Sequence, residues 1–210
     1  MTPTPELEHI SVPGRSGDLL LSNRRYSNVE LTYRVGIPRF FAPTYSALMN
    51  FLLVDAGYHR LEDSYHPEVF RLAVMESEVS PHMGARNHSG TFELTFSCKP
   101  QQYLKSGERT TVFTENGSLF NPTRFDSKPL LRVYGTGQIG VGEETITIGT
   151  NPDYIDLDCE SEDAFCGATN MNGAVTLSSG DFPVLRPNSN GIVLGSGITR
   201  VEITPRWWRL

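Results

Sequence analysis

The sequence has few of the features that mark membrane, disulfide-rich or nucleic-acid-binding proteins. No run of about 18 apolar residues occurs, so no segment is predicted to span a membrane. Residues 1–10 lack the basic segment and the apolar stretch of a secretory signal. Three cysteines among 210 residues do not suggest a disulfide scaffold. Lys and Arg number 18 against 24 Asp and Glu, and the net charge of −6 argues against a surface that grips phosphates.

Histidine is absent after residue 88, which argues against a galectin-type sugar site in the second half of the chain. Such a site uses a histidine, an arginine and a tryptophan on one sheet face. Trp207 and Trp208 are adjacent, so on a strand they point to opposite faces, and we expect them to pack a core or a domain junction. His59 and His66 flank Glu62 and Asp63, but a spacing of seven without a second close pair is weak for a metal site, and surface histidines are favoured. The remaining histidines, His9, His82 and His88, lie in predicted strand or loop segments.

The acidic stretch 153–163 offers another place for chemistry. Asp156 and Asp158 alternate with apolar residues, so both carboxylates are predicted to share one strand face. Such a pair could serve a glycosidase or hold a divalent cation, but the spacing of an EF-hand is absent and no pocket is indicated. A solvated or partner-facing strand is the favoured interpretation.

The cysteines offer no reactive site. Cys159 and Cys166 have acidic neighbours, which raise a thiol pKa and disfavour a nucleophile. Zinc would need closer spacing and a second pair, which Cys98 alone cannot supply. We therefore expect structural free cysteines, with a disulfide as the lesser alternative. We predict no catalytic, cofactor-binding or metal-binding residue, no cofactor, and no enzyme.

Gly135, Gly137 and Gly140 match the dinucleotide-binding pattern G-x-G-x-x-G. That pattern functions only where its last glycine opens a helix, because the helix N-terminus holds the pyrophosphate. Residues 141–149 are instead β-branched and alternating. The segment is therefore predicted to be a strand, a glycine-rich turn and a second strand.

Short alternating segments, 19 glycines and 14 prolines predict a mainly β chain. The firmest strands are expected at 29–37, 91–98, 130–134, 145–148 and 198–204. One helix is predicted at 44–57, capped by Thr44 and ended by Gly57, with Ala47, Leu48, Phe51, Leu52 and Ala56 near helical spacing. Residues 1–8 are expected to be a loose tail and 99–107 a linker, so we predict two domains, 1–105 and 106–210.

Several separated stretches together resemble the distal tail protein (Dit) family of long-tailed phages, also described as phage tail family proteins. They are spread over most of the chain and occur in the family's order and near its spacing: 12–19 (VPGRSGDL), 96–100 (FSCKP), 121–123 (NPT) with 127–130 (SKPL), 134–135 (YG), 156–163, 181–183 (DFP) with Leu185 and Pro187, and 205–208 (PRWW).

The resemblance implies an N-terminal β-sandwich or split barrel with one α-helix and a projecting hairpin arm, followed by a C-terminal galectin-like β-sandwich. It implies a homohexameric ring, single or stacked, that joins the tail tube to the baseplate at the tail tip of the virion, after synthesis in the host cytoplasm. The implied partners are the tail tube protein, a tail-tip or tail-associated protein, the tape measure protein and a receptor-binding protein. DNA would pass through the channel without specific binding, and nothing would insert into a membrane. Residues 58–68 or 80–90 are candidates for the arm.

Two other functions stay open from the residues. The chain could be a carbohydrate-binding β-sandwich that contacts cell-wall glycan, or a β-rich glycan hydrolase that uses Asp156 and Asp158. Some members of the resembled family carry sugar-binding insertions, for which this chain has no room.

Overall fold

The computed structural model describes residues 2–84, 86, 88–150 and 152–210. The fold is mainly β, as predicted, with one α-helix in the part of the chain that is described. The chain divides into two compact units, one up to Gln102 together with Leu210 and the other from Tyr103 to Arg209.

The first unit is built on two long antiparallel strands. β3 (Val29–Ile37) and β7 (Gly90–Cys98) pair over nine residues, from Val29 opposite Cys98 to Ile37 opposite Gly90. β7 was predicted at 91–98, and its alternation of apolar and polar residues buries Phe92 and Leu94 on one face. The other strands of this unit are β1 (Pro5–Ile10), β2 (Leu19–Tyr26), β4 (His59–Leu61), β5 (Val69–Val74) and β6 (His82–Met83). β5 pairs with β4 and β7, and β6 pairs with β7.

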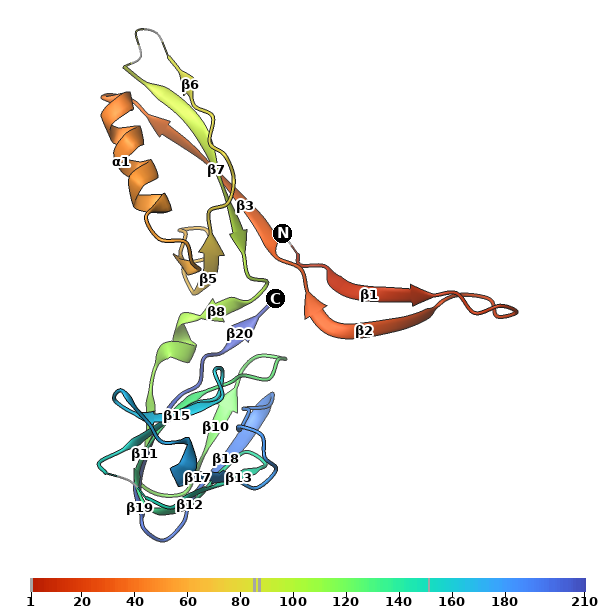
Figure 1. Cartoon of the computed structure of the whole chain (residues 1–210), viewed down its shortest axis with the longest axis vertical. Helices are drawn as coiled ribbons and strands as arrows, with labels where there is room; N and C mark the ends of the chain where they lie inside the picture. The colour runs from red at the N-terminus through yellow and green to blue at the C-terminus, as the bar shows by residue number, and fades with distance from the viewer. Residues whose placement is uncertain (1, 85, 87, 151) are drawn as a thin grey trace. The chain divides into compact units, whose positions relative to one another are not determined.

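The helix α1 (Phe41–Leu53) lies beside the β3–β7 pair (Figure 1). It starts three residues before the predicted position and ends four residues before it. Phe40 is the N-cap and accepts the first backbone hydrogen bond, from Thr44 N at 3.2 Å. Pro43 is tolerated because the first-turn N–H groups have no partner within a helix. Thr44 is therefore inside the helix and not its cap.

The inward face of α1 also differs from the prediction. The side chains that pack on Ile37, Phe92 and Leu94 are Phe41, Tyr45, Leu48, Met49 and Leu52. Phe41 stacks on Tyr45 with ring centroids 5.4 Å apart, and both rings meet Phe92 edge-on. Phe51, predicted to face inward, is 76% exposed.

The second unit is a sandwich of two antiparallel sheets. One sheet has the order β10-β18-β12-β13-β17 and the other β16-β15-β14-β11-β19-β9. The sixteen most buried apolar side chains of the unit lie between them, Leu131, Val133, Ile139, Ile146 and Leu157 among them. The strands of these two sheets are β9 (Thr111–Phe113), β10 (Gly117–Asn121), β11 (Leu130–Gly135), β12 (Gly137–Val141), β13 (Glu144–Ile148), β14 (Ile155–Asp158), β15 (Asp163–Cys166), β16 (Thr169–Asn170), β17 (Val175–Leu177), β18 (Asn188–Leu194) and β19 (Ile198–Thr204). Two further short strands, β8 (Gln102–Leu104) and β20 (Trp208–Arg209), neighbour each other and belong to neither sheet of the sandwich.

Two segments predicted to be irregular are strands. Residues 5–10 form β1, which pairs with β2, so the expected loose tail is wrong there. Residues 102–104 form β8, which neighbours β20 near the end of the chain, so the expected linker is partly a strand. The partner of β8 is distant in sequence, so local composition does not reveal it, whereas β2 directly follows β1 in the chain.

Candidate assembly surfaces

The acidic pair on β14 is neutralised by arginines. Both carboxylates lie on the outer face of the six-stranded sheet, as the alternation predicts. Arg132 on β11, directly opposite Asp156, donates from Nε and Nη2 to the two oxygens of Asp156 at 2.7 and 2.8 Å. Arg206 donates from Nη1 and Nη2 to Asp158 at 2.6 and 2.9 Å. Each aspartate is therefore held in a bidentate ion pair with one arginine.

This pairing fixes the ionisation of Asp158. Hydrogen bonds from Arg206 hold the pKa of Asp158 below its ordinary value, although burial acts in the opposite direction. The pKa of Arg206 is raised by the same contact. A glycosidase needs one carboxyl group with a raised pKa as the general acid. Asp158 cannot supply that acid, and the hydrolase hypothesis has no support in this geometry.

The histidines predicted to be surface residues pair with single carboxylates. His59 Nε2 lies 3.7 Å from Asp55, and His66 Nδ1 lies 3.6 Å from Asp63. Within the described part of the chain, no group of three His, Cys, Asp or Glu side chains is placed to hold a metal ion. Also within that part, no helix is long and apolar enough to cross a membrane.

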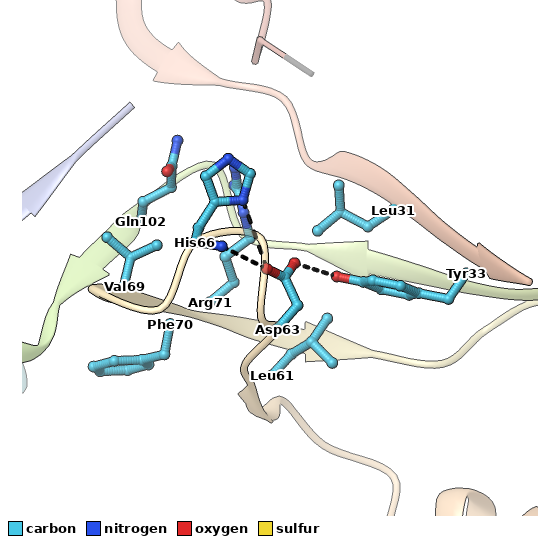
Figure 2. A pocket seen from close by; sticks show the side chains of 9 residues that line it. All are labelled: Leu31, Tyr33, Leu61, Asp63, His66, Val69, Phe70, Arg71 and Gln102. Carbon is cyan, nitrogen blue, oxygen red and sulfur yellow. Dashed lines mark hydrogen bonds and ion pairs between the residues drawn. The ribbon is translucent and has the colours of Figure 1, made fainter.

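Asp63 and His66 line a small polar cleft with Tyr33 (Figure 2). Tyr33 donates to Asp63 Oδ2 at 2.8 Å, and the backbone N–H groups of Tyr65 and His66 donate to Oδ1 at 2.9 Å. Burial is the largest cause of the raised pKa of Tyr33, and the hydrogen bond to Asp63 and its negative charge raise it further. Burial would raise the pKa of Asp63, but its hydrogen bonds outweigh burial and lower it. The cleft holds about 20 Å³, room for one water. Tyr33 stays protonated and Asp63 stays charged at neutral pH, so the pair ties the β4–β5 loop to β3.

The cysteines and tryptophans have structural roles. Cys98, Cys159 and Cys166 are free thiols. Burial, and to a smaller extent the negative charge of Asp158, raises the pKa of Cys159 to about 12, so this thiol is not a nucleophile. Trp207 is buried in the sandwich core, whereas Trp208 stacks on Phe125 at 4.4 Å and donates from Nε1 to the Asp126 carbonyl at 2.9 Å. The adjacent rings do point apart: Trp207 is buried, and Phe125 covers one face of Trp208.

The glycine motif leads into a hairpin, as predicted, but residues 137–141, expected to be part of a glycine-rich turn, are the strand β12. β12 and β13 form a hairpin in which Ile139 pairs with Ile146, and no helix follows Gly140. The glycines are required by a close backbone crossing. Gly135 has a φ of +96°, and a Cβ there would lie 2.1 Å from the carbonyl oxygen of Gly197. No dinucleotide site is present at this motif.

The first large surface without a partner in its own chain is the β1–β2 hairpin. These strands pair only with each other and form a separate two-stranded sheet. Leu19, Leu20 and Leu21 are 40%, 54% and 48% exposed, and Leu7 and Val12 are also exposed. Leu20 points to the opposite face from its two neighbours, so both faces of the ribbon are apolar. An isolated two-stranded hairpin is marginally stable in water, so this one needs a surface to lie on. The sequence predicts only short strands at 9–12 and 19–21 around a turn at 13–18, and a tail at 1–8, so the full length of this hairpin was not expected.

The second such surface is the outer side of α1 and its end. Phe40, Phe51, Leu53 and Val54 are exposed, whereas the opposite stripe of the helix is packed. Exposed apolar groups of this kind mark contacts with other proteins. The molecule therefore offers apolar surfaces for contact, and we find no reactive centre among the described residues.

Comparison with known proteins agrees with this geometry. No protein-family model and no curated protein matches the sequence. Among solved structures, the chain is similar to SPP1 Dit (gp 19.1), described as a paradigm of the hub adsorption apparatus in phages that infect Gram-positive bacteria. The TM-score is 0.74 and the identity 16%, covering 100% of this chain and 90% of that chain.

The phage P2 baseplate contains a similar chain. In its activated conformation with Ca, the TM-score is 0.52 at 11% identity, covering 96% of this chain and 86% of that one. With Sr, the TM-score is 0.52 at 12% identity, covering 100% and 87%. The likeness extends over both compact units. The chain thus has the fold of a phage distal tail (Dit) protein, the family that its sequence resembles.

Proposed function

We propose that the protein is a non-enzymatic structural component of the tail tip of a long-tailed phage or prophage. It forms a homohexameric ring that joins the tail tube to the baseplate and serves as an attachment hub. The observation that carries this proposal is the likeness to SPP1 Dit over the whole chain, both units included. The paired carboxylates and the buried thiol of Cys159 support a role through contact and not through chemistry.

We assign ring formation to residues 1–105. The β1–β2 hairpin and the outer side of α1 expose apolar side chains that folding of a single chain leaves uncovered. Neighbouring copies in a ring would cover them, and burial of apolar surface would hold the copies together. The tail tube protein, the tape measure protein and a tail-associated protein are the expected axial partners.

We assign docking of peripheral proteins, including a receptor-binding protein, to the galectin-like sandwich at residues 106–210. DNA would cross the ring without specific binding. The net charge of −6 supports passage without binding, because negative charge around a channel repels the phosphates of DNA.

Mass measurement tests the proposal. Six chains of 23.4 kDa give a ring of about 140 kDa, which multi-angle light scattering or mass photometry will detect. Negative-stain electron micrographs of the same sample should show six-fold toroids. A monomer in every buffer at tens of micromolar, also when the tail tube protein is added, would refute ring formation.

A further inference from the structure

The outer face of the five-stranded sheet carries no charged residue. Side chains alternate across each strand, so the residues that lie next to buried ones along the strand point away from the sandwich core. The outward positions, here called the neutral face, are Ser118, Phe120, Gln138, Gly140, Thr145, Thr147, Thr176, Ser189, Gly191 and Val193. Charged residues make up 20% of the chain, and solvated sheet faces normally carry them.

The outer side of the opposite sheet, in contrast, carries charged residues. It bears Arg132, Asp156, Arg200 and Glu202, joined in ion pairs. Arg132 and Arg200 also lie over the rings of Tyr154 and Tyr134, at 4.2 and 3.9 Å. The contrast lies within one folded unit, so it does not come from overall composition. Interface centres are depleted of charge and carry aromatic side chains, and the neutral face fits that description.

The shape of the neutral face is self-complementary. Phe120 is 63% exposed and pairs with Ser189, while the diagonal neighbour Gly191 has open space where a side chain would be. Val193 is 52% exposed and lies over Gly140. One face therefore carries projecting apolar groups beside positions with little or no side chain. Two identical faces related by a two-fold axis can each place Phe120 against the small residues of the other.

Electrostatics favours a copy of the same chain as the occupant. Each chain carries a net charge of −6, so identical molecules repel one another at most surfaces. A face without charged residues adds no like-charge repulsion of its own, so the repulsion between two copies is smallest there. We propose that the neutral face binds the neutral face of a second copy of this chain.

The size of the face sets the expected strength. Five strands about 4.8 Å apart and about five residues long, at about 3.3 Å per residue, make a face of roughly 19 by 17 Å. Its area of about 320 Å² is small compared with the ~800 Å² per partner of a stable pair. A single pair of faces should therefore associate weakly. The contact itself does not require the ring; if the proposed ring exists, several such contacts act together and join two rings.

Sedimentation velocity on the full-length protein tests the contact, from about 1 to 200 µM. The wild type should show a concentration-dependent doubling of mass, from monomer to dimer or from hexamer to a double ring of about 280 kDa (twelve chains of 23.4 kDa). Phe120→Asp and Val193→Asp should each weaken that step at least a hundredfold, because each contact would bury two aspartates, each costing about tenfold or more. Both side chains are more than half exposed, so thermal melts should stay within a few degrees of the wild type.

Val112→Asp is the matched control. Val112 is 55% exposed on β9, on the other outer face of the same sandwich, so this variant places the same charge on an equally exposed valine. It should leave the doubling intact. Absence of doubling in the wild type, or equal loss in Val112→Asp, overturns the proposal. So does binding of a neutral cell-wall polysaccharide that Phe120→Asp abolishes, since it would assign the face to glycan. A hexamer that forms but never doubles refutes this contact alone, whereas a monomer–dimer equilibrium without hexamer supports the contact and refutes the ring.

Discussion

Replacing the three leucines at the start of β2 with serine should separate ring assembly from folding. Leu19, Leu20 and Leu21 are 40%, 54% and 48% exposed, and among the described strands β2 pairs with β1 alone. Removing them therefore takes little from the stability of the monomer. In the proposed ring, a neighbouring copy covers these side chains, and the variant loses that burial.

The structure sets the size of the loss. Full burial of a leucine side chain is worth about 1.5–3 kcal/mol, and about half of each side chain is still exposed, so each contributes about 1 kcal/mol on assembly. Three leucines then contribute about 3 kcal/mol to each contact, which corresponds to roughly a hundredfold change in its dissociation constant. The ring of the triple variant should fall apart at concentrations where the wild-type ring is intact.

Mass photometry at nanomolar and light scattering at micromolar concentrations cover that range. The triple variant should show mainly monomer where the wild type shows hexamer, with a melting temperature within a few degrees of the wild type. Val112→Ser, which removes a similarly exposed apolar side chain from the second unit, should leave the mass unchanged. A triple variant that remains hexameric at every concentration would show that the hairpin does not hold the ring together.

Three further changes test the packing. Gly135→Ala should lower the free energy of unfolding in urea by at least about 2 kcal/mol, since a left-handed φ and a carbonyl 2.1 Å from the new Cβ both oppose it, whereas Gly173→Ala, with open space around it, should cost about 1 kcal/mol or less. Arg206→Ala should cost about 2 kcal/mol at pH 7 by leaving the Asp158 carboxylate unpaired. Because the folded pKa of Asp158 is lowered, the ion-pair stability is present above about pH 4 and lost as the pH falls through the folded pKa, so the difference between the variant and the wild type should shrink in urea titrations as the pH is lowered below 3.8. Iodoacetamide at pH 8 should label Cys166 first in the native protein and all three thiols after denaturation, by intact mass, and equal native labelling would contradict the burial of the other two.

The regular strands were predictable because their patterns reflect burial within the chain. Residues 29–37 and 198–204 were placed at the residues where β3 and β19 begin and end. In both, alternation follows a core that the folded monomer already contains. The hairpin at the glycine motif was predictable for the same reason, since β-branched alternation continued where a nucleotide-binding helix would have begun.

The ion pairs of the candidate site were not predictable. Alternation put Asp156 and Asp158 on one face, but nothing local indicated that Arg132 and Arg206 would meet them. Those arginines are 24 and 48 positions away from their partners, and they come into reach only through the order of strands in the sheet. This pairing makes the two carboxylates part of a structural network and not a possible acid catalyst. The choice between these two functions therefore depended on long-range contacts.

The failures that remain have a common physical origin. Periodicity assigns every apolar residue to an internal core, so Phe51 was predicted to face inward, although it is 76% exposed. Residues 5–8 looked like a tail because the strand they pair with is itself exposed on both faces. A chain whose apolar residues are divided between its own core and contacts with other copies will mislead such reasoning at the contacts. These two errors fall on the hairpin and on the outer side of α1, the same surfaces to which ring assembly is assigned.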